Sequence, residues 1–232
     1  MAGRGLFVVG TDTDVGKTQV AAVIVGSLAA AGLRVGVYKP VASGIDPGQP
    51  QSSDAERLAR ATGRPLAIER VCPQAFRAAC APHRSARAEG REVDDALLRS
   101  GLDEWLATSD LVVVEGAGGL CSPLAATTLV VDLACDLGLP LVVVDDARLG
   151  AVGRSLATVR VARAAGLRVA AVVLSHTRPA VHAADDVAGS HRIALDAAAD
   201  LAAWLPGLPI AILPHGGRAV EPPLDWLGIV DR

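Results

Sequence analysis

The feature that most constrains the fold is a set of six short apolar runs in which polar and apolar residues do not alternate. They cover residues 6–9, 34–38, 111–114, 140–144, 168–174 and 209–213. Strands that are apolar at nearly every position are buried on both faces, as in a parallel sheet covered by helices. Four of the runs follow a Gly-Leu pair, and glycine often caps the end of a preceding helix. The sequence therefore predicts strands that repeatedly follow helices.

Stretches rich in Ala and Leu lie between these runs. They predict helices over 17–31, 53–62, 94–107, 128–137, 151–165 and 190–204. The alternation predicts an α/β fold with helices on both faces of a mostly parallel central sheet, for which we expect about seven strands. We expect a single domain over residues 1–232. Residues 40–52 are rich in Pro and Gly and predict a loop, whereas residues 64–92 follow no regular pattern.

The composition argues against several classes of protein. With 51% hydrophobic residues the chain can bury a core, and a net charge of −3 does not favour a nucleic-acid partner. We expect no membrane span, because no run of about 18 uncharged apolar residues occurs. The short apolar stretch after Met1 does not fit a signal peptide. The four cysteines form no CxxC pair, so we expect a reducing compartment and hence the cytoplasm.

Only two of the 22 basic residues are lysines, Lys17 and Lys39. Lysine and arginine are not interchangeable, so a chain this rich in arginine is expected to keep lysine where a compact ammonium is needed. Lys17 lies in Gly10–Thr18 (GTDTDVGKT), between the first strand and a helix. This is the pattern of a P-loop, where backbone N–H groups and the lysine bind phosphates and the Thr18 hydroxyl can ligate Mg²⁺. The usual frame has a glycine at the position of Thr11, and here Gly10 comes one residue earlier.

Two more strand ends should lie at the same edge of the sheet as the P-loop. Lys39 begins KPVASG after the second strand and predicts a second cation near the transferred phosphate, with Ser43 contacting the substrate. Glu115, in VEGAGG, ends a buried strand, as an acid that binds a metal ion does. The glycines after Glu115 allow a close approach of the backbone to a ligand. Asp54 is either a further Mg²⁺ ligand or an acid at a helix N-terminus, and the residues alone favour the second interpretation.

Three loops carry weaker signals. Residues 148–154 combine a helix N-terminus with flanking arginines, which either bind a carboxylate or form a solvated surface. Ser175-His176 and Pro214-His215-Gly216 follow the last two strands and are candidates to flank a nucleobase.

As a set, GTDTDVGKT, KPVASG, Ser53-Asp54, Pro82-His83 and VEGAGG resemble the dethiobiotin synthetases, in order and over essentially the whole chain. The resemblance implies a cytoplasmic P-loop ATPase, a ligase that forms C–N bonds. Such an enzyme uses ATP, CO₂ and Mg²⁺ to close a cyclic urea on 7,8-diaminopelargonic acid, which gives dethiobiotin in biotin biosynthesis. The resemblance also implies a homodimer with the active site near the subunit interface.

The resemblance further implies roles for individual residues. Lys39, Lys17 and Thr13 would be catalytic. The substrate would contact Ser43, Asp14, Gly150, Gly153 and Arg154, and Mg²⁺ would be held by Thr18, Asp54 and Glu115. The nucleotide would contact Asp14, Val15, Gly16, Lys17, Thr18, Gln19, Asp54, Glu115, Gly116, Ala117, Gly118, Ser175, His176, Pro214, His215 and Gly216.

The chain departs from the family pattern at two places. Ser175-His176 stand where the family commonly has an asparagine that reads adenine, and the chain contains no asparagine, which predicts relaxed base choice. Gly150–Arg154 replaces the common Gly-x-x-Asn-His, so Arg154 or backbone N–H groups would hold the substrate carboxylate.

Two other classes of protein fit less well. A nucleotide-switched partitioning ATPase carries a signature lysine early in the P-loop, where this chain has Asp12. A cobyrinic-acid-type amidating synthetase needs a glutaminase domain with a nucleophilic cysteine, for which 232 residues leave no room.

Overall fold

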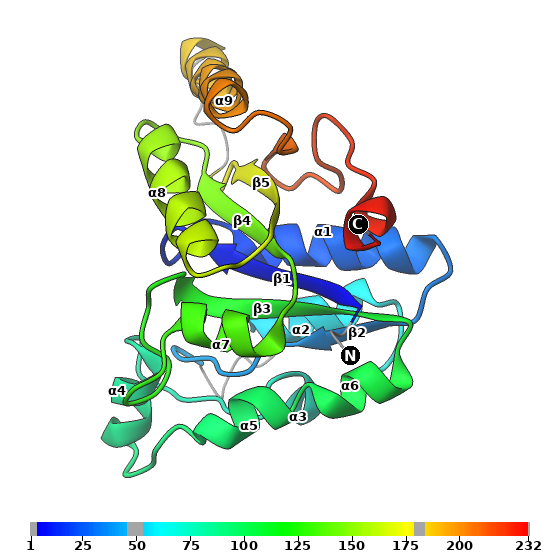
Figure 1. Ribbon diagram of the computed structural model, residues 1–232, viewed down its shortest axis with the longest axis vertical. Coiled ribbons are helices and arrows are strands. Elements are labelled where there is room, and N and C mark those ends of the chain that lie inside the picture. The colour runs from blue at the N-terminus through cyan, green and yellow to red at the C-terminus, as the bar shows by residue number, and fades with distance from the viewer. Residues whose placement is uncertain (1–3, 46–52, 179–183, 232) are drawn as a thin grey trace.

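The centre of the molecule is one sheet of six strands in the order β2-β3-β1-β4-β5-β6 (Figure 1). The structure is a computed structural model that describes residues 4–45, 53–178 and 184–231. The strands are β1 (Gly5–Gly10), β2 (Val35–Tyr38), β3 (Leu111–Gly119), β4 (Leu141–Asp146), β5 (Val169–Ser175) and β6 (Ile210–Leu213). All neighbouring strands are parallel, which confirms the predicted α/β fold. The described residues form six strands rather than about seven, because each of the six apolar runs forms one strand and no other run is apolar enough to join them.

The strands are buried along almost their whole length. Every residue of β1 and β2 is buried, and so are the first six residues of β3. The register pairs Phe7 of β1 with Val114 of β3 on one side and with Leu141 of β4 on the other. The burial of consecutive residues confirms that the unalternating apolar runs form strands covered on both faces.

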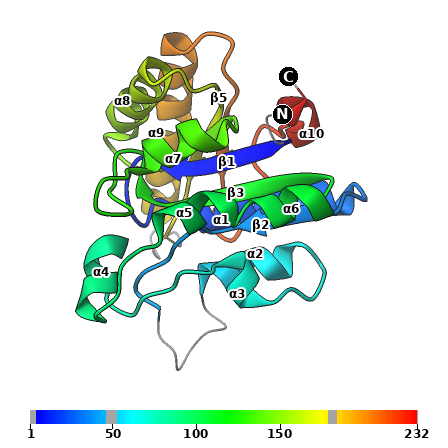
Figure 2. The ribbon, with the colours of Figure 1, turned by 60° about the horizontal axis from the view of Figure 1, so that its bottom comes forward.

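Helices cover both faces of the sheet. They are α1 (Lys17–Ala30), α2 (Asp54–Ala61), α3 (Ile68–Val71), α4 (Pro82–Ala88), α5 (Asp95–Ser100), α6 (Asp103–Thr108), α7 (Val130–Leu137), α8 (Ala151–Ala164), α9 (Ala184–Trp204) and α10 (Trp226–Val230). Helices α7 and α8 lie on one side of the sheet, and α1 and α2 lie on the other (Figure 2). Helix α9 packs against α8 and β6. None of the helices in the described residues is both long enough and apolar enough to cross a membrane.

The structure corrects several of the predicted boundaries. The helix expected over 94–107 is divided into α5 and α6 at Gly101, where a Cβ atom would collide with the hydroxyl of Tyr38. Helix α9 begins at Ala184, earlier than residue 190. The irregular region 64–92 contains the short helices α3 and α4. Residues 46–52 of the predicted loop lie outside the described residues.

The parallel arrangement brings the carboxyl ends of all six strands to one edge of the sheet. The P-loop follows β1, Lys39 follows β2, and Glu115 lies within β3 at that edge. The loops after β4, β5 and β6 meet the same edge, which is where ligands bind in open α/β sheets.

Candidate active site

The P-loop turns sharply from β1 into α1. Gly16 has a φ of 92° and immediately precedes Lys17, the first residue of α1. A Cβ atom at Gly16 would also collide with the Ser175 hydroxyl, so glycine is required both by the backbone conformation and by the available space. Lys17 is buried, and its Nζ donates a hydrogen bond of 2.8 Å to the carbonyl oxygen of Asp12. The ammonium of Lys17 is therefore bonded to the backbone of the P-loop, the loop that is expected to bind a phosphate.

Glu115 is the fully buried acid of this site. Its Oε1 accepts hydrogen bonds from Thr18 Oγ1 at 2.8 Å and from Lys39 Nζ at 2.7 Å. Its Oε2 is also buried and has no hydrogen-bond partner. An unpartnered carboxylate oxygen at full burial is unfavourable, so Oε2 is suited to a cation that arrives with the substrate.

Lys39 joins Glu115 to Asp54. Its Nζ lies 2.8 Å from Asp54 Oδ2, and its side chain is only 4% exposed. Burial acts to lower the pKa of Lys39, but the carboxylates of Glu115 and Asp54 outweigh burial and raise that pKa above its ordinary value. Lys39 is therefore a permanent cation in this site.

Asp54 lies at a helix N-terminus, as one of the two interpretations of the sequence requires, and its role as a Mg²⁺ ligand stays a prediction. It is the first residue of α2, whose N-cap Ser53 accepts a hydrogen bond of 3.2 Å from the amide of Glu56. Burial acts to raise the pKa of Asp54, but Lys39 outweighs it and holds that pKa below the ordinary value. Asp54 is thus ionised at the helix N-terminus and faces the site at the same time.

The donor set around Glu115 fits a magnesium ion. Glu115, Asp54 and Thr18 offer two carboxylates and a hydroxyl, the hard oxygen ligands that Mg²⁺ prefers. No cluster of three or more His, Cys, Asp or Glu with the arrangement of a metal site occurs among the described residues. The protein could therefore supply only part of the coordination, and Mg²⁺ usually keeps waters and phosphate oxygens as its other ligands.

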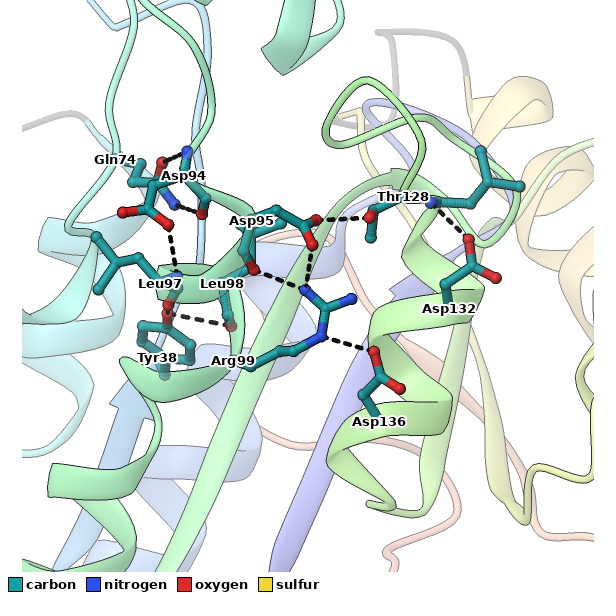
Figure 3. A network of polar contacts seen from close by, with 11 residues as sticks. Tyr38, Gln74, Asp94, Asp95, Leu97, Leu98, Arg99, Thr128, Asp132 and Asp136 are labelled. Carbon is teal, nitrogen blue, oxygen red and sulfur yellow. Dashed lines mark hydrogen bonds and ion pairs between the residues drawn. The ribbon is translucent and has the colours of Figure 1, made fainter.

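A polar network fixes β2 and the β3–α7 loop to α5 (Figure 3). The hydroxyl of Tyr38, the residue before Lys39, donates a hydrogen bond of 2.8 Å to the carbonyl oxygen of Leu97. Thr128 Oγ1 donates to Asp95 Oδ1 at 2.5 Å. Helix α5 thereby joins β2, the strand directly before Lys39, to the loop that follows β3.

Most of the predicted residues line one pocket of about 870 Å³. Those that line it are Thr13, Asp14, Gly16, Lys17, Thr18, Gln19, Lys39, Ser43, Asp54, Glu115, Ala117, Gly118, Ser175, His176, His215 and Gly216. A smaller cavity of about 260 Å³ shares Thr13, Asp14 and Thr177 with this pocket. The larger pocket thus joins the P-loop, both lysines and the loops after β5 and β6.

Comparison with known proteins identifies the family. The family model described as "AAA domain" matches residues 4–209. The ATP-dependent dethiobiotin synthetase BioD of Anaeromyxobacter dehalogenans strain 2CP-1 is 49% identical over 176 residues, which are 76% of this chain and 78% of that protein. The protein of the same name from Caulobacter sp. strain K31 is 38% identical over 214 residues, 91% of this chain and 88% of its own length.

The chain belongs to the ATP-dependent dethiobiotin synthetases. Solved structures with lower identity show the same fold. The hydrogenase maturation factor HypB from Archaeoglobus fulgidus has a TM-score of 0.51 at 18% identity, covering 92% of this chain and 82% of its own. Chloroplast FtsY from Physcomitrella patens has a TM-score of 0.51 at 15% identity, covering 100% of this chain and 65% of its own.

Some residues that the dethiobiotin synthetase pattern implies lie away from the larger pocket. Val15 lines the smaller cavity instead, and Gly116 and Pro214 line neither cavity. Gly150 and Gly153, at the start of α8, also line neither.

Arg154 turns back toward the interior of this dethiobiotin synthetase. Its Nε lies 3.0 Å from Oδ1 of Asp145, whose side chain is fully buried. Its two terminal nitrogens donate weaker hydrogen bonds to the carbonyl oxygens of Leu149 and Asp146. The guanidinium is therefore held by Asp145, and Arg154 is not among the residues that line either cavity.

Several pocket residues of this family member were not singled out from the sequence. Arg57 lines the larger pocket one turn beyond Asp54 on α2, and this spacing on a predicted helix is a signal that could have found it. Cys80, Ser122 and Thr177 also line the pocket, but they lie in loops that have no motif.

Proposed function

We propose that this chain joins CO₂ to 7,8-diaminopelargonic acid at the expense of ATP and closes the cyclic urea of dethiobiotin, with ADP and phosphate as the other products. One observation carries the proposal. Lys17, Lys39, Thr18 and the carboxylates of Glu115 and Asp54 meet in one pocket at the P-loop. The identity to the dethiobiotin synthetases, over three quarters of the chain or more, gives this pocket its chemistry.

The P-loop and α1 bind the triphosphate in this proposal. Backbone N–H groups at a helix N-terminus attract phosphate oxygens, and Lys17 adds a full charge. The bond from Lys17 Nζ to the Asp12 carbonyl leaves the other N–H groups of the ammonium for phosphate oxygens. Arg57, at the rim of the same pocket, adds a further cation.

Magnesium fits beside the triphosphate. Thr18, Asp54 and the free Oε2 of Glu115 would hold the ion. When bound, Mg²⁺ neutralises charge on the phosphates during phosphoryl transfer. Lys39 bridges the two carboxylates and neutralises charge on both, which reduces their repulsion of one another and of the phosphates.

We assign the diamine to the smaller cavity beside Thr13 and Asp14. Carboxylates of Asp14 and Asp146 line this cavity and suit amino groups, and Arg148 and Arg178 in its wall suit a carboxylate. The substrate carries both kinds of group. Arg154 is held by Asp145, and Arg148 by Asp146, whose Oδ2 lies 3.0 Å from Arg148 Nε. Arg178 is therefore the arginine of this wall that we assign to the substrate carboxylate.

The reaction then needs little covalent chemistry from the protein. One amine of the substrate and CO₂ form a carbamate, and a carbamate oxygen attacks the γ-phosphate and expels ADP. The second amine attacks the carbon of the resulting mixed anhydride, and phosphate leaves as the ring closes. Lys17 and Lys39 neutralise the charge that develops on the transferred group, and the pocket holds the reactants in line.

We further propose that residues 1–232 act as one domain and that two copies associate with their sites near the interface, in the cytoplasm. The resemblance to the dethiobiotin synthetases supports this proposal. Sedimentation of the purified protein at micromolar concentration tests it, and a monomer under assay conditions contradicts the dimer.

The test of the reaction is phosphate release by the purified protein with Mg-ATP and bicarbonate, with and without 7,8-diaminopelargonic acid. We expect release only with the diamine, accompanied by the mass of dethiobiotin. Equal release without the diamine contradicts the proposal and favours a nucleotide-switched ATPase.

A further inference from the structure

A second buried acid lies at the carboxyl edge of the sheet, outside the mechanism described above. The side chain of Asp145, in β4, is fully buried. Its Oδ1 accepts hydrogen bonds from Thr11 Oγ1 at 2.6 Å, Arg154 Nε at 3.0 Å and the Asp146 amide at 2.8 Å. Its Oδ2 accepts one from Ser155 Oγ at 3.2 Å. Both oxygens are therefore occupied, which differs from Glu115 with its free Oε2.

Thr11 connects this acid to the P-loop. The Thr11 amide donates a hydrogen bond of 2.9 Å to the carbonyl oxygen of Val144, so the backbone still runs alongside β4 at this point. The carbonyl of the following residue, Asp12, accepts the bond from Lys17 Nζ. The bond from Thr11 to Asp145 thus fixes the residue that directly precedes the acceptor of the Lys17 ammonium.

Arg154 supplies the counter-charge of the buried Asp145 carboxylate. A buried carboxylate without a counter-charge is strongly unfavourable, and Arg154 supplies that charge from the first turn of α8. Its side chain is 28% exposed. The family pattern commonly has Asn-His where this chain has Gly153-Arg154, and the acid at position 145 gives the arginine a partner.

We propose that Asp145, with Arg154 as its counter-charge, is a positioning residue that fixes the P-loop through Thr11 and so aligns Lys17 for the nucleotide phosphates. The inference rests on the proposed function only in requiring that the larger pocket binds a nucleotide. In this proposal Asp145 acts on the phosphates only indirectly, through Thr11 and the backbone of Asp12, which binds Lys17.

The test compares two hydroxyls that bind the same carboxylate. Thr11→Val removes the bond toward the P-loop, and Ser155→Ala removes the bond toward α8, while Asp145 keeps Arg154 in both variants. We measure the Kd of ADP by calorimetry, the KM and kcat for ATP, and the Tm. We expect Thr11→Val to raise the Kd of ADP and the KM of ATP at least about fivefold, the scale of a lost hydrogen bond to a charged acceptor. Ser155→Ala should leave the Kd of ADP and the KM of ATP within about twofold of wild type, even if it lowers Tm as much as Thr11→Val does.

Two further variants guard the interpretation. Thr11→Ser restores the hydroxyl and should recover most of the nucleotide affinity, and Thr11→Ala serves if the valine variant does not fold. Thr11 is only half-buried, so the smaller side chain is tolerable. Nucleotide affinity that is unchanged in Thr11→Val, or reduced equally in Ser155→Ala, overturns the proposal. If the wild type binds ADP but releases no phosphate with the diamine, the proposed reaction fails, and the comparison of Kd values still decides the role of Asp145.

Discussion

Replacing Lys39 by methionine should have two separable effects, one on stability and one on turnover. Lys39 Nζ is the only cation within an ion-pair distance of Glu115 among the described residues, at 2.7 Å, and Glu115 is 1% exposed. Breaking a buried ion pair by removing one partner costs about 3–5 kcal/mol. Asp54 also loses its partner but is 44% exposed, so water replaces much of that interaction.

The expected loss of stability is large enough to measure by thermal unfolding. In a domain of this size, 1 kcal/mol moves Tm by about 2–4 °C, so Lys39→Met should lower Tm by roughly 6–20 °C. The kcat should fall by at least about 10²-fold, the scale of a lost electrostatic contact to the transition state. The assay is diamine-dependent phosphate release below the unfolding range of the variant.

A double-variant comparison separates a catalytic role of Lys39 from that of a mere counter-charge. Glu115→Gln removes the charge that Lys39 neutralises, so Lys39→Met should cost much less stability in this background. If Lys39 acts on the transferred phosphoryl group, the double variant should still turn over about 10²-fold more slowly than Glu115→Gln alone at saturating Mg²⁺. Equal rates for these two variants would refute the catalytic role, as would near-wild-type turnover in Lys39→Met.

Three further outcomes are expected. Glu115→Gln should raise the Mg²⁺ concentration for half-maximal rate at least about tenfold, and an unchanged titration would mean that the metal binds elsewhere. Burial, aided by His191, lowers the pKa of His176, so protonation favours the unfolded state and stability is lost as pH falls below about 6.5. Tm should therefore fall less between pH 7.5 and 5.5 in His176→Gln than in wild type, and equal falls would contradict this assignment. Because the chain has no asparagine, CTP and GTP should compete with ATP within about tenfold, whereas strong selection for ATP would show that another group reads the base.

The fold could be predicted because its signal is local and repeated. Each apolar run forms a strand, and each strand is buried as the lack of alternation requires. The helix expected over 94–107 is divided at Gly101, where the hydroxyl of Tyr38, distant in the sequence, leaves no room for a Cβ atom. Periodicity within a segment carries no information about such a neighbour.

The central part of the site could also be predicted from the sequence. Parallel strands bring their carboxyl ends to one edge, which predicts Lys17, Lys39 and Glu115 at the same edge. The strand order, in which β2, β3 and β1 are neighbours, then brings the three residues together and came from the structure. Asp54 could not be assigned from its position alone, since an acid at a helix N-terminus has a sufficient reason to be there. The structure adds the ion pair with Lys39, which the helix does not require.

Two buried acids follow the apolar run of a strand in this molecule, and the sequence does not tell them apart. Glu115 follows the apolar residues of β3 and Asp145 those of β4, and each pairs with one cation. The difference lies in the second oxygen, since Oε2 of Glu115 is free whereas Oδ2 of Asp145 accepts from Ser155. A carboxylate with a free buried oxygen is suited to a metal ion, whereas both oxygens of Asp145 are already engaged with their neighbours. That distinction depends on partners contributed by other elements of the fold, and on it we base the proposals of a metal ion for Glu115 and of P-loop alignment for Asp145.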